Sequence, residues 1–204
     1  VDPNAILGDM PTTHGKPLGG TPLHEAACWG AVGAIRLLVQ HGAELKAQDS
    51  CGDTPLHSAA RTLYTRACRE LVGLGASVEA RNNDGYTPLM LAAMVDDEGA
   101  CTRALLDSPP YAVFADGCSG NQMRTALHLA VLEGTLEAAK ALVEAGADVT
   151  ATDLRGRQPL HLASLSHYSE FYYGNKIVQL LLEAQAPVTV ADHNANIPLH
   201  FAAA

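Results

Sequence analysis

Histidine and cysteine are the residues of this chain best suited to chemistry, because an imidazole can bind a metal or move a proton and a thiolate can attack a substrate. The sequence contains nine His and five Cys. Five of the histidines recur at intervals of 33 residues or more, namely His24, His57, His128, His161 and His200. A zinc-binding helix places two histidines four positions apart. The wide spacing therefore predicts no metal site and no cofactor.

Motifs for catalysis are missing from the sequence as well. It has no Gly-x-Ser-x-Gly elbow, no Gly-Lys-Ser/Thr phosphate loop and no His-Glu-x-x-His pair. The cysteines are odd in number and show no Cys-x-x-Cys spacing, which is typical of reduced thiols in an intracellular protein, cytoplasmic or nuclear. We expect no enzyme activity in this chain.

Each of the five histidines belongs to a motif of four residues that recurs along the chain. Residues 21–24 and 54–57 read Thr-Pro-Leu-His, and residues 87–90 read Thr-Pro-Leu-Met. Looser copies begin at positions 125, 158 and 197, so successive copies start 33, 33, 38, 33 and 39 residues apart. A period near 33 indicates stacked supersecondary units, each of which contacts only its neighbours.

Every unit shows the same internal order of elements. Thr is a good N-cap and Pro fits the first helical turn, so the motif predicts the start of a short helix that continues through a pair of Ala residues. A second, apolar helix follows, as in residues 34–39, and Gly42, Gly75 or Gly146 supplies the left-handed cap after it. An extended stretch and a turn lead to the next motif, so the chain is predicted to be all-α.

This order of elements resembles the ankyrin repeat, whose Thr-Pro-Leu-His-x-Ala signature the motif matches. The resemblance covers nearly the whole chain and implies an ankyrin-repeat solenoid of stacked helix-turn-helix units with β-turn or hairpin finger loops. It also implies that the five motif histidines are structural and bind the backbone of the neighbouring turn. It divides the single domain 1–204 into the end of a preceding repeat with a long finger loop, five complete repeats and the start of another: 1–20, 21–53, 54–86, 87–124, 125–157, 158–196 and 197–204.

Composition narrows the class of partner. The formal net charge is −9 at pH 7, which disfavours binding to the phosphates of nucleic acid. No apolar run approaches the roughly 18 residues of a membrane span, so we expect no membrane insertion. The first residue is Val1 and the last motif is cut short, so we expect a fragment of a longer protein. We also expect this fragment to be monomeric.

Two repeats are longer than the others. The third repeat has five extra residues, near 96–99 and in the loop 116–124, and the fifth has six, between its helices at 166–174. Insertions in such arrays often serve a functional face. They can also be neutral, since a longer surface loop costs little.

The repeat alignment singles out candidate partner-binding residues. The resemblance implies contacts at the finger tips and along the exposed side of the first helices, which line a concave face. Trp29, the only Trp, is either such a contact or packs on the neighbouring first helix, whereas the finger arginines suit a carboxylate-bearing segment. The candidates are Trp29, Asp53, Arg61, Tyr86, Met94, Arg124, Leu132, Glu133, Arg155, Arg157 and Tyr172.

Three functions remain open at this point. The favoured one is a non-catalytic protein–protein interaction module, an adaptor or scaffold that binds a partner protein or an extended peptide. The second is a substrate-recruiting domain of a larger enzyme, such as a kinase, a transferase or a ubiquitin ligase. The third is a spacer or self-associating element. The fold alone does not choose among them.

Overall fold

The structure is a computed structural model that describes residues 2–6, 19–107, 122–165 and 174–203. The described residues form eleven α-helices, and the chain divides into two compact units, Val1–Ala92 and Ala93–Ala204. The boundary falls inside helix α5, Pro88–Val95. The prediction of an all-α chain is confirmed for this part of the sequence.

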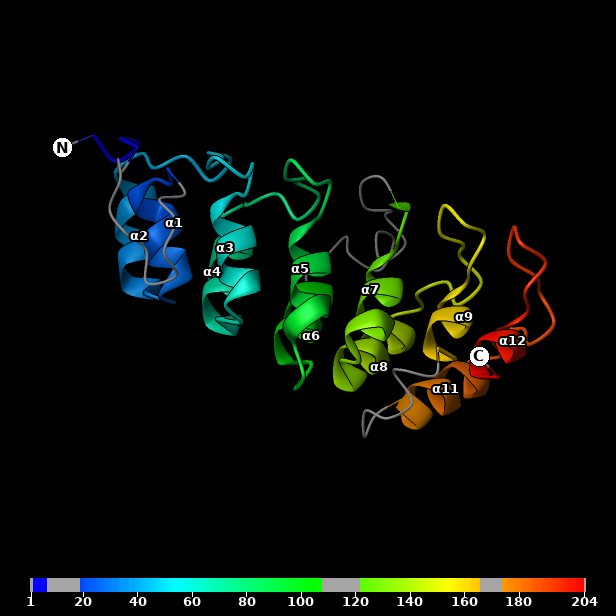
Figure 1. Cartoon of the computed structure of the whole chain (residues 1–204). Coiled ribbons are helices and arrows are strands. Elements are labelled where there is room, and N and C mark those ends of the chain that lie inside the picture. Colours follow the sequence, from blue (N-terminus) through cyan, green and yellow to red (C-terminus); the bar gives the residue numbers. More distant parts are fainter. Residues whose placement is uncertain (1, 7–18, 108–121, 166–173, 204) are drawn as a thin grey trace. The chain divides into compact units, whose positions relative to one another are not determined.

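Unit 1 contains two helix pairs and most of α5. The first pair is α1 (Pro22–Cys28) and α2 (Val32–Gln40), and the second is α3 (Pro55–Arg61) and α4 (Thr65–Gly73). Helix α1 packs on α2 and α3, α3 packs on α4, and α2 packs on α4, so each pair meets the next through both of its helices (Figure 1). Leu23, Ile35, Leu56 and Leu71 are fully buried and form the core of this unit.

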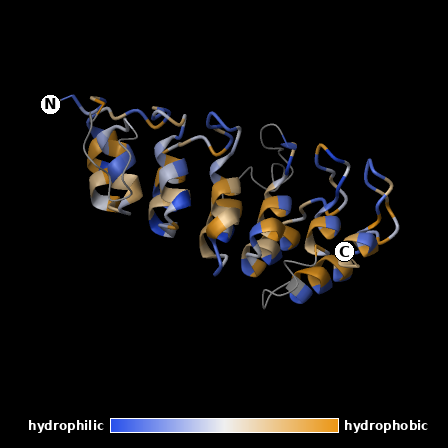
Figure 2. Cartoon of the chain, viewed as in Figure 1, coloured by the Kyte–Doolittle hydropathy of each residue, from blue (hydrophilic) through white to orange (hydrophobic). Residues whose placement is uncertain are grey.

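Unit 2 begins with the end of α5 and with α6, and its later helices pack on one another in the same way as those of unit 1. Its helices are α6 (Ala100–Leu106), α7 (Ala126–Glu133), α8 (Leu136–Glu144), α9 (Pro159–Ala163), α11 (Gly174–Glu183) and α12 (Pro198–Ala202). Helix α7 packs on α8 and α9, and α8 packs on α6 and α11. Apolar residues concentrate in these helices and hydrophilic residues in the loops between them (Figure 2). Leu105, Leu127, Leu142 and Leu162 are fully buried here.

The motif histidines bridge neighbouring repeats. In the first repeat the backbone N–H of Thr21 donates to Nδ1 of His24 at 3.1 Å. Because Nδ1 accepts a hydrogen bond, the ring proton lies on Nε2, which donates to the carbonyl oxygen of Asp53 at 2.9 Å. In the same way Nε2 of His57 bonds to the carbonyl oxygen of Tyr86 at 2.9 Å, Nε2 of His128 to that of Arg157 at 3.0 Å and Nε2 of His161 to that of Asn196 at 3.2 Å. His200 is exposed, and its Nδ1 accepts from the N–H of Ile197 at 3.3 Å.

The loop before each motif is called the finger loop below, and four of these loops are closed by an Asp or Asn side chain. Oδ1 of Asp153 accepts from the backbone N–H groups of Arg155 and Arg157 at 2.9 and 3.0 Å. Asp49, Asn82 and Asp192 accept in the same way from the second and fourth residues after them. This local side-chain bond mimics a backbone turn and explains why Asp or Asn occupies the position.

The backbone adopts the left-handed conformation, with positive φ, at two recurring positions of the repeat. After the second helix, Gly42, Gly75 and Gly146 have φ of 90°, 96° and 86°, which confirms the predicted caps, but Gln185 takes this place with φ of 65°. In the finger loops Gly52, Gly85 and Gly156 are left-handed, with Met123 and Ala195 at the matching position. Residues with a β-carbon adopt this conformation at a cost of about 1–2 kcal/mol.

Part of the third repeat's insertion is described. Residues 96–99 link α5 to α6, and Oδ2 of the buried Asp96 accepts the backbone N–H of Thr102 at 2.7 Å. Most of the loop 116–124 and nearly all of the insertion 166–174 lie outside the described residues.

Candidate functional site

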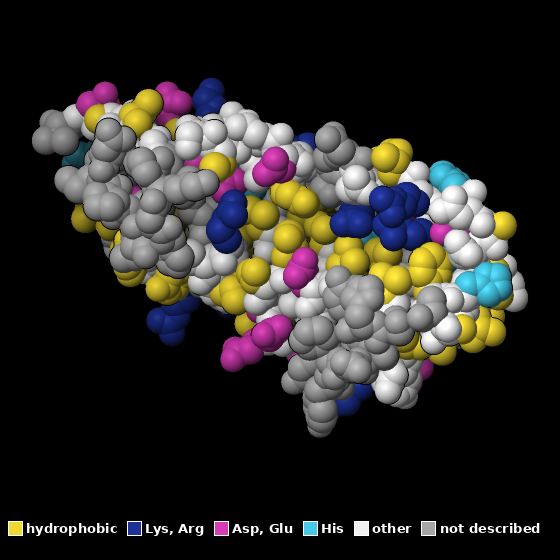
Figure 3. Space-filling model, viewed as in Figure 1, with side chains coloured by type: hydrophobic (Ala, Val, Ile, Leu, Met, Phe, Trp, Pro, Cys, Tyr) yellow, Lys and Arg dark blue, Asp and Glu magenta, His cyan; other side chains and the backbone are white. Residues whose placement is uncertain are grey.

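Two arginine side chains from two finger loops of unit 2, and the backbone of a third arginine, lie around one carboxylate. Nε and Nη2 of Arg157 donate to Oδ2 of Asp153 at 3.0 and 2.7 Å. Nε of Arg124 lies 4.0 Å from the same oxygen, and the side chain of Arg155 is exposed next to them in sequence. Figure 3 shows Lys and Arg side chains gathered over the loops that precede α7 and α9, beside hydrophobic side chains.

Asp153 is held as a carboxylate at the centre of this group. Burial acts to raise the pKa of Asp153, but hydrogen bonds from the Arg157 side chain and from the backbone N–H groups of Arg157 and Arg155 outweigh it and hold the pKa below its ordinary value. Asp153 and Arg157 are 4% and 8% exposed. The guanidinium of Arg157 is thus largely buried inside the loop, the side chain of Arg124 is 25% exposed, and that of Arg155 is exposed.

Two exposed apolar side chains flank these arginines. Met123 is 49% exposed and Leu154 is 54% exposed. Together with Arg124 and Arg155 they make a surface that we call the finger patch. Leu154 was singled out from the sequence as a finger residue, but Asp153 and Met123 were not, although Asp or Asn recurs five positions before four of the six motif copies and would have pointed to Asp153.

The finger loop of unit 1 uses its charged residues differently. Asp53 is 3% exposed. Its Oδ1 accepts from Nδ2 of Asn82 at 2.7 Å, and its Oδ2 pairs with Nη2 of Arg61. The backbone carbonyl of half-buried Tyr86 accepts from His57. These contacts hold the loop together and leave Arg61, whose side chain is 52% exposed, as the residue of this group open to solvent.

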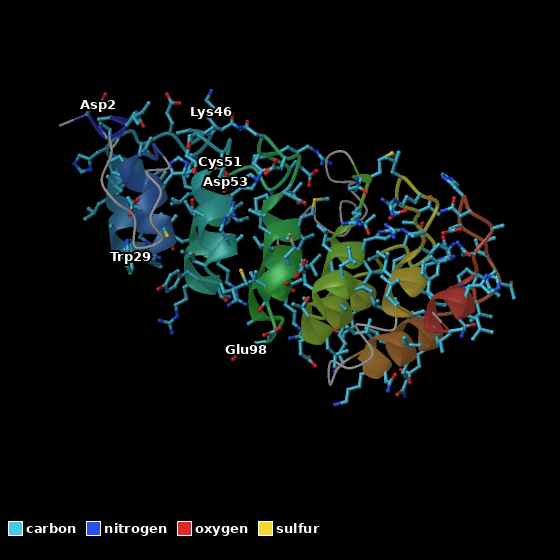
Figure 4. All side chains as sticks on the ribbon, in the orientation of Figure 1. Asp2, Trp29, Lys46, Cys51, Asp53 and Glu98 are labelled. Atoms are coloured by element: carbon cyan, nitrogen blue, oxygen red, sulfur yellow. The ribbon has the colours of Figure 1, made fainter. Side chains whose placement is uncertain are left out.

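Trp29 lies away from the fingers. It is 55% exposed and sits at the end of α1 remote from Cys51 and Asp53 (Figure 4). Helix α1 has seven residues, which at 1.5 Å each separate its ends by about 10 Å. Tyr64, 41% exposed, lies against Gly30 beside it, where an added β-carbon would meet its Cδ1 at 2.3 Å. Unit 1 therefore carries two separate exposed areas.

The remaining candidates lie at the corresponding ends of other first helices. Met94 near the end of α5 and Leu132 near the end of α7 are half-buried, and Glu133 is exposed. Tyr172 lies outside the described residues. The structure thus groups the finger arginines with one another and places Leu132 and Glu133 at the other end of α7.

Thiol and metal chemistry find little support in the geometry. Burial, together with the Glu25 carboxylate, raises the pKa of the Cys28 thiol against the smaller opposite effect of Arg61. A raised pKa makes a thiol a poor nucleophile at neutral pH. Within the described ranges no group of three or more His, Cys, Asp or Glu side chains could hold a metal ion. Over the same ranges no helix is long and apolar enough to cross a membrane.

Comparison with known proteins defines the class. The family model described as ankyrin repeats (3 copies) matches residues 5–82, 64–153 and 117–173. These matches cover most of the chain, which therefore belongs to the ankyrin-repeat family, as predicted. The predicted ankyrin-repeat fold is confirmed with it, and the chain is a protein–protein interaction module of that class.

Two individual proteins are similar to it. NF-kappa-B inhibitor alpha from Sus scrofa is 38% identical over 71 residues, which are 35% of this chain and 23% of that protein. The chain thus matches less than a quarter of that relative's length. The crystal structure of the ankyrin repeat domain of Bcl-3, described as a unique member of the IkappaB protein family, has a TM-score of 0.79 and 36% identity, with 90% of this chain and 80% of that chain covered.

Proposed function

We propose that this chain is a non-catalytic module that binds a partner protein or an extended peptide through its finger loops and the exposed ends of its first helices. Its proposed place of action is the cytoplasm or the nucleus, and it acts as a monomer. The residues that make the contacts are the finger arginines in unit 2 and Trp29 and Arg61 in unit 1.

The observation that carries this proposal is the way in which successive finger loops are joined. The backbone N–H of Asn83 donates to the carbonyl oxygen of Cys51 at 3.0 Å in unit 1. In unit 2 the N–H of Leu154 donates to Gln122 at 2.9 Å, and the N–H of His193 donates to Arg155 at 3.0 Å. The backbone of these finger loops is therefore held in place before a partner arrives, which lowers the entropic cost of binding.

One candidate partner comes from the similar proteins. NF-kappa-B inhibitor alpha is, by its name, an inhibitor of NF-kappa-B, and it shares 38% identity with this chain over 71 residues. We therefore propose NF-kappa-B subunits as the first proteins to test for binding.

Site-specific photo-crosslinking tests which surface binds. A photoreactive amino acid would replace Cys51 or Leu154, both exposed on fingers, or Arg69 on α4 or Gln179 on α11, both exposed on second helices. We expect purified NF-kappa-B subunits, or a partner captured from cell extract, to crosslink at the finger positions and not at the second-helix positions. Crosslinks only from Arg69 and Gln179, or none at all, would overturn the proposal.

A second measurement tests the first-helix contact. Trp29→Ala should weaken binding of the crosslinked partner by about tenfold or more, because large aromatic side chains dominate interface energetics. The control is Leu37→Ala, since Leu37 is also a large hydrophobic residue and is 59% exposed but lies on α2. Equal affinities for the two variants would remove Trp29 from the proposed interface.

A further inference from the structure

Arg124 in the finger patch has a side chain that is 25% exposed and that carries one buried donor, Nε, without an acceptor. Its Nε is buried and has no hydrogen-bond partner among the described residues. The nearest carboxylate oxygen, Oδ2 of Asp153, is 4.0 Å away, which is beyond hydrogen-bond distance. A buried donor without a partner loses its hydration and gains nothing in return.

Asp153 cannot supply the missing acceptor, because its capacity is already used. Its Oδ1 accepts the backbone N–H groups of Arg155 and Arg157. Its Oδ2 accepts both Nε and Nη2 of Arg157. A carboxylate offers about four lone-pair sites, and these four bonds fill them. Asp153 therefore leaves the Arg124 guanidinium available for an acceptor on a partner.

The charges around this site do not cancel. Asp153 neutralises Arg157, which leaves Arg124 and Arg155 as two positive charges on a chain whose net charge is −9. The side chain of Arg155 has no hydrogen-bond or ion-pair partner in the described part of the chain. Guanidinium groups bind carboxylates through two parallel, charge-assisted hydrogen bonds.

The finger patch also has an apolar component. Met123 and Leu154 are about half exposed, and each directly precedes one of the two arginines in the sequence. The N–H of Leu154 is bonded to Gln122 and the carbonyl of Arg155 to His193, so both loops are held in place. The surface alternates apolar and cationic side chains over two adjacent fingers.

From these contacts we infer that the finger patch binds an acidic segment of a partner protein, whose carboxylates pair with Arg124 and Arg155 and whose apolar side chains cover Met123 and Leu154. The inference rests on the proposed function and names the chemistry of the partner. A nucleic acid fits less well, since its affinity depends on many phosphate contacts, while the patch offers two cations on an acidic chain.

Peptide selection tests this partner chemistry directly. A random dodecapeptide library displayed on phage would be selected on the wild-type chain, on Arg124→Gln/Arg155→Gln and on Arg66→Gln/Arg69→Gln. The last variant removes the same charge from exposed positions on α4. The wild type and the α4 variant should enrich peptides that combine Asp or Glu with apolar residues, and the patch variant should not. Unchanged melting curves would exclude misfolding.

Titration gives the quantitative result. By fluorescence anisotropy the best-enriched acidic peptide should bind the patch variant at least about tenfold more weakly than the α4 variant. Its Asp→Asn and Glu→Gln analogue should bind all three chains weakly. Enrichment of peptides without acidic residues, no enrichment, or equal loss in both variants would overturn the inference. So would tighter binding of a single-stranded DNA oligonucleotide that depends on the same arginines.

The outcome separates this inference from the proposed function. If photo-crosslinking places a protein partner on the fingers but the acidic peptides fail, the interaction module stands and the acidic partner is wrong. If no partner crosslinks at the finger positions, the proposed function itself fails.

Discussion

Nε2 of His128 lies 3.0 Å from the carbonyl oxygen of Arg157. A ring that is fully buried in one repeat therefore fixes the backbone of the next finger, whose side chains surround Asp153. The same carbonyl also accepts the N–H of Asp153 at 2.9 Å, which closes the loop. The histidine that the family motif repeats thus supports the geometry of the candidate site without facing a partner.

Replacing this histidine should destabilise unit 2. His128→Ala removes the bond to Arg157 and leaves the N–H of Thr125, which donates to Nδ1 at 3.3 Å, unsatisfied inside the protein. We expect a loss of about 3 kcal/mol in the free energy of unfolding, measured by urea denaturation. The control is His200→Ala, at the same motif position but exposed, which should cost less than about 1 kcal/mol. Equal losses would show that the bond across the repeats contributes little.

The buried histidines should make stability depend on pH. Burial lowers the pKa of His57 and of His128, although the carbonyls of Tyr86 and Arg157 act in the opposite direction. Below about pH 6.5 the unfolded chain therefore binds protons that the folded chain does not. Stability should be constant above that pH and fall as the pH drops towards the folded pKa values, by up to about 1.4 kcal/mol per pH unit for each ring. Urea denaturation between pH 7.5 and 5.5 measures this fall.

The chain itself provides the control for this pH effect. Met90 replaces histidine in the third copy of the motif, where its sulfur accepts the N–H of Thr87 at 3.5 Å. His57→Met/His128→Met should therefore fold with lower stability but with a flatter dependence on pH. If the slope of the double variant equals that of the wild type, other groups cause the titration.

The fold was predictable from the sequence because its determinants are local and repeat. Thr or Pro at the start of a helix and Gly after it act within a few residues, and a period near 33 fixes the register of the units. The same register explains these fingers, since Asp49, Asn82, Asp153 and Asp192 stand five residues before four of the six motif copies. The family signature contains the histidines but not these Asp and Asn positions, which precede it.

The candidate site was predictable only in part, because solvent exposure depends on contacts outside the motif. Asp53 and Arg157 were singled out as surface residues from their finger positions, yet they are 3% and 8% exposed. Each forms an ion pair within its own unit, Asp53 with Arg61 and Arg157 with Asp153. Likewise, nothing in the sequence shows that Arg124 lacks an acceptor, because this follows from the number of bonds that Asp153 already accepts.

Backbone geometry predicts a stabilising substitution at Gln185. This exposed residue has φ of 65° at the position where Gly42, Gly75 and Gly146 follow their helices. Gln185→Gly should raise the free energy of unfolding by about 0.5–1 kcal/mol, because relief of left-handed strain exceeds the extra freedom of glycine in the unfolded chain. The reverse change, Gly146→Gln, should cost about 1 kcal/mol. An added β-carbon at Gly146 has nothing within 4 Å, so strain alone would cause the loss. Thermal melting of the two variants checks whether their effects have opposite sign.

Asp153 should be the finger residue whose loss is most damaging. Asp153→Asn removes a buried negative charge and leaves the guanidinium of Arg157, 2.7 Å away, buried without its counter-ion. Breaking such a pair by removing one partner costs about 3–5 kcal/mol. Because the pKa of Asp153 is held below its ordinary value, its contribution is present above about pH 4 and is lost as the pH falls through the folded pKa.

The control for this prediction is Asp84→Asn. This residue is on an exposed finger position, so the change should alter stability by less than about 0.5 kcal/mol. If urea denaturation at pH 7 gives similar values for both variants, the ion pair between Asp153 and Arg157 does not stabilise the loop.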